Sequence, residues 1–170
     1  MKINIYILTG LMASISIILG VIENFIPSPV PAIRLGLSNV PILIMIYFAG
    51  ANYALLLALL KAFIVPIFSA NIVFKFSLSV PATLISFLFM YITYKLFKNR
   101  LSVVTISVIG AVAHMATQIV IVSIFYIKGL LYTNYTGILL LSAVITGVLM
   151  GIISYRIINH RQIGDMFTRI

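Results

Sequence analysis

The hydrophobic pattern of the chain centres on residues 33–64, where two apolar runs are joined by a short turn. A polar stretch opens this segment, an apolar run extends from Val40 to Phe48, and a second run follows the turn at residues 50–52. Lys61 is the one charge set deep in the second run. A single cation inside an apolar hairpin is not typical of a water-soluble core, because burying a charge is costly. We expect the remaining helices to form a cage around this hairpin.

Six apolar segments can be traced along the chain, and each predicts a helix. They cover residues 5–26, 37–49, 53–68, 72–97, 101–127 and 135–158. A helix rises about 1.5 Å per residue, so about 20 residues are needed to cross about 30 Å of hydrocarbon. The second and third segments are shorter, and we expect at least one of them not to cross fully. The pattern predicts an all-α, polytopic membrane protein with six transmembrane helices.

Composition agrees with this class. Of the 170 residues, 63% are hydrophobic and 8% are charged, and the mean hydropathy is +1.25. A soluble domain carries about 25% charged residues. We therefore expect residues 1–158 to form a single membrane domain and residues 159–170 a short basic cytoplasmic tail. The chain contains no cysteine, which excludes disulfides, thiolate metal sites and a thiol nucleophile.

The net charge of +9 has two interpretations, nucleic-acid binding or the cytoplasmic bias of cations in membrane proteins. The cations are scattered between apolar segments rather than gathered on one face, so we expect no nucleic-acid partner. An inside amino terminus places seven cations on the inner side, namely Lys2, Lys95, Lys98, Arg100, Arg156, Arg161 and Arg169. Three fall outside: Arg34, Lys75 and Lys128. This asymmetry predicts a multi-pass protein with both termini cytoplasmic. We expect the membrane to be a bacterial plasma membrane.

Several polar side chains lie within the apolar segments, where they normally face a bundle interior or a wet cavity. Lys61 falls near mid-depth, and His114 and Gln118 share one face of the fifth segment because they are four residues apart. Other polar positions repeat by four in the fourth and sixth segments: Lys75, Ser79 and Thr83, and then Ser142 and Thr146. If these stripes converge, they form an outward-opening pocket with two cations.

Each of these groups also has an ordinary structural role. Helical Ser and Thr commonly bond to carbonyls of their own helix, and we favour that role for the hydroxyls. His114 and Gln118 alternatively join neighbouring helices. For these two residues, and for Lys61 and Lys75, we favour the cavity.

Glu23 sits at the outer end of the first segment, where it either pairs with Arg34 or lines a cavity. The same segment holds two pairs of small residues spaced by four: Gly10 and Ser14, and Ser16 and Gly20. Small residues at this spacing let another helix approach closely, either within this chain or in a partner.

Residues 34–61 resemble the second and third helices of substrate-binding (S) components of energy-coupling-factor (ECF) vitamin transporters. Those helices show a Lys/Arg-x-x-x-Ser-Asp-Ile-Pro opening, a Phe-Gly-Pro turn and a Leu-Leu-Lys. The corresponding positions here are Arg34 with residues 38–41, residues 48–50 and residues 59–61.

The chain is more similar to the family called heptaprenyl diphosphate synthase component I, also known as the Gx transporter family. Its Pro-x-Ile-Lys-Leu-Gly-Leu-Ala-Asn resembles residues 31–39, and its Gly-Ala-x-x-His-Asn-x-x-Gln resembles residues 110–118. Its closing Thr-Gly-x-x-x-Gly is similar to residues 146–151. The resemblance covers about residues 8–156. Met115 stands where the family has Asn beside the His, which removes a polar group from that helix.

These resemblances imply an S-component-like bundle that acts as the integral membrane substrate-binding subunit of an ECF-type transporter. Its expected partners are a small-molecule ligand, a transmembrane coupling subunit with ATPases, and the lipid bilayer. The excess of cations over acids favours an anionic or amphipathic solute, related to a cofactor or an isoprenoid. We expect this solute to contact Arg34, Asn39, Lys61, Lys75, His114 and Gln118. S components dock through an Ala-x-x-x-Ala; here Ala13 is followed by Ile17, and Gly10 and Ser14 would substitute.

The family label suggests prenyl-chain synthesis, which needs clustered carboxylates to hold Mg²⁺ against a diphosphate. The only acids are Glu23 and Asp165, near opposite ends of the chain. We therefore expect no enzyme activity and assign no cofactor. The alternative function is a non-catalytic membrane accessory subunit for polyprenyl diphosphate or quinone synthesis, or for an envelope redox assembly.

Overall fold

The computed structural model describes residues 4–25, 36–69, 71–97, 100–129 and 134–160, and every regular element within them is helical. The predicted all-α class is therefore confirmed. The six α-helices are α1 (Ile5–Ile22), α2 (Val40–Phe48), α3 (Ala51–Ile67), α4 (Ile72–Phe97), α5 (Val103–Phe125) and α6 (Asn134–Ile158). Two short 3-10 helices, η1 (Glu23–Phe25) and η2 (Leu37–Asn39), lie between α1 and α2.

Local sequence signals explain several helix boundaries. The side chain of Asn4 caps α1 by accepting a hydrogen bond from the Tyr6 N–H at 3.1 Å, and Ser102 caps α5 by accepting one from the Thr105 N–H at 3.1 Å. Gly50 separates α2 from α3 with a φ of +84°, a conformation that glycine adopts without steric cost. The turn of the hairpin thus consists of two residues, Ala49 and Gly50, and α3 begins directly after it.

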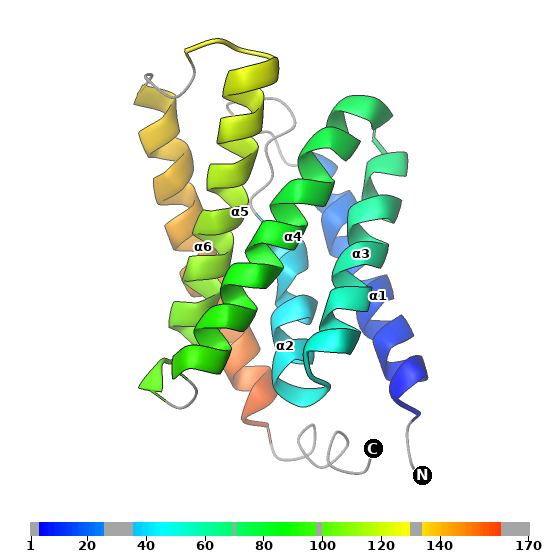
Figure 1. The fold of residues 1–170 in the computed structure, drawn as a ribbon. Helices are drawn as coiled ribbons and strands as arrows, with labels where there is room; N and C mark the ends of the chain where they lie inside the picture. The colour runs from blue at the N-terminus through cyan, green and yellow to red at the C-terminus, as the bar shows by residue number, and fades with distance from the viewer. Residues whose placement is uncertain (1–3, 26–35, 70, 98–99, 130–133, 161–170) are drawn as a thin grey trace.

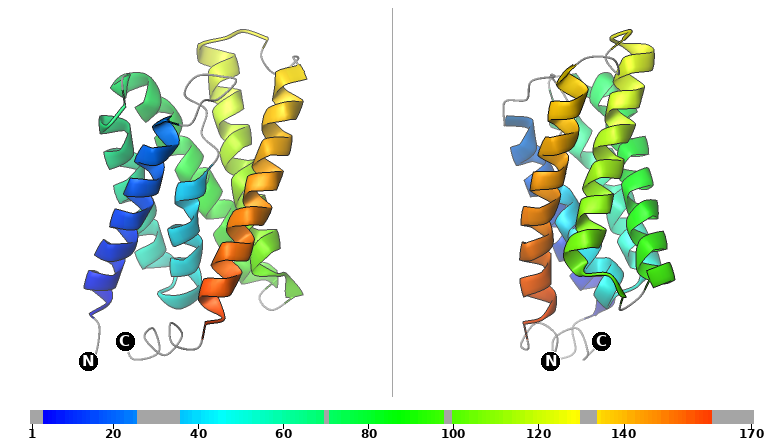
Figure 2. Two further views of the ribbon diagram at one scale, coloured as in Figure 1. Left: turned by 180° about the vertical axis from the view of Figure 1, so that it is seen from behind. Right: turned by 90° about the vertical axis from the view of Figure 1, so that its left-hand side faces the viewer.

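The helices alternate in direction, so α1, α3 and α5 ascend from the end where α6 finishes, and α2, α4 and α6 descend toward it (Figure 1). We call this end the terminal end and the other the opposite end. Helix α1 packs on α3, α3 on α4, α4 on α5 and α5 on α6, which forms an open arc. Helix α2 lies between α1 and α6 and closes the arc (Figure 2). The prediction that the other helices surround the hairpin is right for α2. It is wrong for α3, which is part of the surrounding wall.

Four helices have the length and apolar composition to cross a membrane, namely α1 continued by η1, α4, α5 and α6. Helix α3 has 17 residues and α2 has nine, which correspond to about 25 Å and about 13 Å at about 1.5 Å per residue. Six full crossings are therefore not established. The two helices that are too short, α2 and α3, correspond to the two segments that were already short in the sequence.

Helix α2 is the most deeply buried element of the bundle. All seven residues from Val40 to Ile46 are buried, and the helix begins at about mid-height and ends at the terminal end (Figure 2). Its apolar surface is continuous around the helix, as expected for a helix enclosed by protein on every side. This short inner helix places its first residues in the middle of the bundle.

Helices α5 and α6 pack through backbone contact at two glycines. A Cβ added to Gly147 would lie 2.8 Å from the Cα of Val108, and one added to Gly151 would lie 2.7 Å from the Cα of Val104. Side chains cannot move aside here because the neighbouring atoms belong to the main chain. The closing Gly-x-x-x-Gly is therefore a helix-packing motif within this protein.

Gly151→Ala should destabilise the bundle, because the new methyl group overlaps the α5 backbone. The cost expected for overpacking is about 1–3 kcal/mol, and it is measured as a lower midpoint of thermal unfolding in detergent. Gly137→Ala is the matched control in the same helix, since a Cβ there would meet nothing within 4 Å. Equal midpoints for the two variants would contradict the proposed packing.

Candidate functional site: a buried polar cluster

The α2–α3 hairpin brings Lys61 and Asn39 together at the same height. Each is eleven positions from Gly50, one before the turn and one after it. The Lys61 ammonium group donates a hydrogen bond to Oδ1 of Asn39, and the two residues are 1% and 7% exposed. The sequence placed Lys61 near mid-depth and proposed both residues as site residues, and the structure joins them directly.

The polar contact continues from Asn39 into the opposite wall of the bundle. Its Nδ2 donates to Oγ of Ser86 on α4 at 3.4 Å, and the Ser86 hydroxyl donates to the carbonyl oxygen of Gly110 on α5 at 2.8 Å. Ser86 is 0% exposed. One chain of hydrogen bonds thus links α3, the start of α2, α4 and α5 in the middle of an apolar bundle. Such a network holds its members rigidly when each is satisfied.

The position of η2 is fixed by Glu23, which is 5% exposed. One carboxylate oxygen accepts a hydrogen bond from the N–H of Leu37 at 2.6 Å, and the other accepts one from the hydroxyl of Ser38 at 3.0 Å. The carbonyl of Ser38 in turn accepts from the hydroxyl of Ser16 on α1 at 2.6 Å. These charge-assisted contacts attach the segment that carries Asn39 to the end of α1.

His114 and Gln118 form the second part of the cluster. Their Nε2 atoms lie 2.9 Å apart, and they are 3% and 1% exposed. Gly36 connects them with the first part: its φ is +90°, and a Cβ there would lie 3.2 Å from Asn39 Nδ2 and 3.8 Å from His114 Cδ2. Only glycine fits this left-handed position without strain. The predicted residues Asn39, Lys61, His114 and Gln118 therefore gather around the start of α2.

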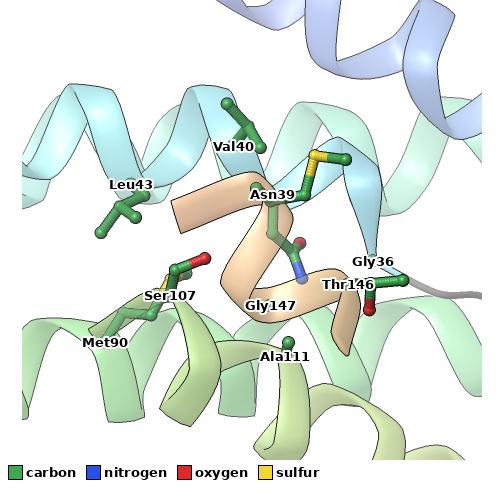
Figure 3. A pocket seen from close by; sticks show the side chains of 10 residues that line it. Gly36, Asn39, Val40, Leu43, Met90, Ser107, Ala111, Thr146 and Gly147 are labelled. Atoms are coloured by element: carbon green, nitrogen blue, oxygen red, sulfur yellow. The ribbon is translucent and has the colours of Figure 1, made fainter. Parts of the chain in front are cut away.

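A small cavity adjoins Asn39 between α2, α4, α5 and α6 (Figure 3). The amide of Asn39 points toward Gly147 and Ala111, and Ser107 and Thr146 lie at its sides (Figure 3). The cavity offers about 10 Å³ to a water-sized sphere, which is room for about one water molecule and far less than the roughly 300–1,000 Å³ of a small-molecule site. In this conformation the cavity is therefore too small to hold the predicted ligand.

The hydroxyls divide into two groups. Ser142 and Thr146 donate to the carbonyls of Leu139 and Ser142, at 2.7 and 2.9 Å, which confirms the prediction that they bond within their own helix. The prediction is wrong for Ser79 and Thr83, because their hydroxyl oxygens are buried without a hydrogen-bond partner among the described residues.

The other predicted site residues lie apart from the cluster. Lys75 is half-buried near the start of α4, and its ammonium group donates to Oδ1 of Asn24 at 3.4 Å. Arg34 lies outside the described residues, as does any pairing between it and Glu23.

The predicted docking residues divide between two faces of α1. Gly10 and Ser14 are exposed on its outer face, whereas Ala13 is 4% exposed and faces the bundle interior. The second small pair, Ser16 and Gly20, is buried and packs inside the chain. A docking role for the exposed pair stays a prediction.

Sequence reasoning missed Ser86 and the anchoring role of Glu23. Ser86 lies three residues after Thr83 and therefore on the same face of α4, so extending the stripe by one turn would have found it. No comparable signal exists for Glu23, because its partners are a backbone N–H and a hydroxyl fourteen and fifteen residues away. Among the described residues, no group of three His, Cys, Asp or Glu side chains could hold a metal ion.

The fold and the buried cluster define the class: an all-helical protein whose long apolar helices are those of a multi-pass membrane protein. The family model described as heptaprenyl diphosphate synthase component I matches residues 12–157. The chain belongs to this family, as its motifs indicated. No curated protein and no solved structure matches the chain.

The coupling between Lys61 and Asn39 can be measured with a double-mutant cycle. Asn39→Leu removes an acceptor from a buried ammonium group and should cost about 3–5 kcal/mol of stability. The same change in a Lys61→Met background should cost less, by about 1–3 kcal/mol, in thermal or denaturant unfolding in detergent. Asn159→Leu, at an exposed position, is the control. Additive effects of the two changes would show that the contact is unimportant.

Proposed function

We propose that this protein is the membrane-embedded substrate-binding subunit of an ECF-type transporter. It captures a small anionic or amphipathic solute at the opposite end of the bundle, which faces outward, and passes it inward with a coupling subunit and ATPases. Both termini then lie on the cytoplasmic side, in agreement with the distribution of the cations.

The observation that carries this proposal is the burial of Lys61 in a polar cluster at mid-depth. A charged side chain inside a membrane bundle is expensive and marks a substrate or ion pathway by default. A scaffold that only packs helices gains nothing from it, since apolar residues of similar volume are often as stabilising as a buried charged pair. The residues gathered with Lys61 are hydrogen-bond donors and amides. The described acid nearest to Lys61 in the chain is Glu23 on η1, and both of its carboxylate oxygens already accept hydrogen bonds.

The S-component resemblance supplies the mechanism. The chain carries no nucleotide-binding motif, so the energy for transport comes from other subunits. The narrow cavity beside Asn39 fits a closed resting state, and the solute enters when the outward half of the bundle separates. The exposed small residues Gly10 and Ser14 on α1 form a face where the coupling subunit can approach closely.

A second function is favoured by a different surface. A groove of about 600 Å³ between α4 and α5 is lined almost wholly by apolar side chains, including Ile85, Phe89, Val112 and Val120. Its volume lies in the range of small-molecule sites, about 300–1,000 Å³. The description of the family names a prenyl synthase component, and such a groove suits the hydrocarbon chain of a prenyl substrate held for a partner enzyme. The protein would then be a non-catalytic accessory subunit.

Lys61→Met tests the transport proposal. The protein is purified from its native membrane, and small molecules and protein partners that co-purify are identified by mass spectrometry. We expect the wild-type chain to retain an anionic or amphipathic solute and ATPase-containing partners, and the variant to lose the solute while keeping a monodisperse elution profile. Lys95→Met is the matched control, because Lys95 is exposed near the terminal end of α4.

Retention of the same solute by wild type and Lys61→Met would exclude Lys61 from the site. Recovery of a prenyl synthase together with a prenyl compound, with no transport subunits, would establish the accessory-subunit function instead.

A further inference from the structure

Two buried hydroxyls on α4 differ from five other helical hydroxyls of the bundle. Thr9, Ser77, Thr117, Ser142 and Thr146 each donate to a carbonyl three or four residues earlier in their own helix. Ser79 and Thr83 are 3% and 0% exposed, and their hydroxyl oxygens have no hydrogen-bond partner among the described residues. Leaving a buried hydroxyl unsatisfied is unfavourable, and the carbonyls of the same helix would ordinarily remove that cost. Ser154 on α6, which is 0% exposed, is a third such hydroxyl, but only Ser79 and Thr83 lie one turn apart on the same helix face.

The packing of α3 on α4 sets the height of these hydroxyls relative to Lys61. The rings of Phe63 and Phe76 are in contact, with centroids 5.2 Å apart, and the two helices run in opposite directions (Figure 1). Lys61 precedes Phe63 by two residues and is therefore level with Leu78, which follows Phe76 by two residues. Helical side chains lean toward the start of their helix, so the Lys61 ammonium group descends from there toward the height of Thr83.

The packing of α4 on α5 sets their height on the other side. The hydrogen bond from Ser86 to the Gly110 carbonyl places those two residues level. Thr83 lies three residues nearer the opposite end and is thus level with residue 113, beside His114. At these heights, Ser79 and Thr83 lie on α4, which packs against α3 with Lys61 on one side and against α5 with the His114–Gln118 pair on the other.

The stripe reaches the opposite end of the bundle through Lys75, which lies four residues before Ser79 on the same face of α4. At about 1.5 Å per residue, Lys75, Ser79 and Thr83 lie at about 5, 11 and 17 Å from the start of α4. The stripe therefore begins with a half-buried ammonium group, continues with two hydroxyls and ends beside a second, fully buried ammonium group. The described residues of the stripe include two cations and no acid, and Glu23, the acid near both ends of it, already accepts hydrogen bonds at its two oxygens.

We infer that Ser79 and Thr83 form a solute pathway from Lys75 to Lys61, and that it is selective for a small oxyanion, a carboxylate or a phosphate group. The hydroxyls donate to the oxyanion, and the two ammonium groups provide the charge. This inference rests on the proposed function and narrows its substrate to the anionic class. It adds to the site two residues that the sequence pattern assigned a structural role.

The natural absence of cysteine makes a direct test possible. Single Ser79→Cys and Thr83→Cys variants, each nearly isosteric, are exposed from the outside in oriented membranes to thiol reagents of opposite charge. The probes are methanethiosulfonate ethylsulfonate, an anion, and its ethyltrimethylammonium counterpart, a cation. Ile85→Cys, on the apolar groove side of α4, and Ser142→Cys, whose native hydroxyl bonds to its own helix, are the matched controls.

We expect both pathway variants to react faster with the anion than with the cation, and the controls to react slowly with both. The expected preference is about a hundredfold or more, because one unit charge about 10 Å away, at an effective dielectric constant of about 20, speeds the reaction of the anion and slows that of the cation by at least about tenfold each. Adding Lys61→Met should remove most of the preference without removing the reaction. Full labelling after denaturation confirms that each thiol is intact.

The two proposals fail in different ways. If the pathway thiols react no faster than the controls, Ser79 and Thr83 are packed structural residues and the inference is wrong, even where a solute co-purifies with the wild-type chain. If they react equally with both reagents, the pathway lacks anion selectivity and the substrate class is wrong. Anion-selective labelling in a protein that co-purifies with no transport subunits would uphold the pathway and refute the ECF assignment.

Discussion

The bundle is built around the need to stabilise one ammonium group in an apolar interior. Lys61 is 1% exposed, and the cost of removing its charge from water is offset by polar groups that reach it from within the protein. Asn39 provides an amide oxygen, and the other end of that amide is held by Ser86, which is held by the backbone of α5. The contact therefore constrains four helices at once. Its position also explains why α2 starts at mid-height.

A helix that crossed the whole bundle at this place would have its first residues at a membrane surface. The short α2 instead brings a 3-10 turn, a left-handed glycine and the amide of Asn39 into the interior, where their polar groups require partners. Glu23 satisfies part of this requirement by accepting a hydrogen bond from the backbone of η2. The imidazole ring of His114 lies close to Gly36 and brings two further polar nitrogen atoms to this region. Irregular backbone at this depth is tolerated in membrane proteins where protein or a polar cavity surrounds it. The broken helix and the polar cluster are thus one feature.

The sequence predicted the helices well because their signals are local. The apolar run over residues 72–97 predicted both ends of α4 as the structure has them, and the symmetry of Asn39 and Lys61 about Gly50 follows from residue spacing alone. What the sequence did not determine is which faces meet. Ser79 and Thr83 were assigned to their own helix because that is the usual choice for such hydroxyls, whereas in the structure their oxygens have no hydrogen-bond partner among the described residues. The role of Glu23 could not be predicted because its partners belong to η2, and the sequence does not show that η2 packs against the end of α1.

The glycine contact between α5 and α6 has a mechanical consequence. Where two backbones touch, as at Gly147 and Gly151, no rotamer change can alter the spacing of the helices, so the pair tilts or slides as one body. The boundary between α4 and α5 is different, because the atoms nearest to Gly110 belong to the flexible side chain of Met90. Any movement that widens the bundle is thereby directed to the α4 side of α5. In the transport cycle that we propose, the polar stripe of α4 lies on this boundary, and the α5–α6 pair is the rigid frame against which the bundle opens.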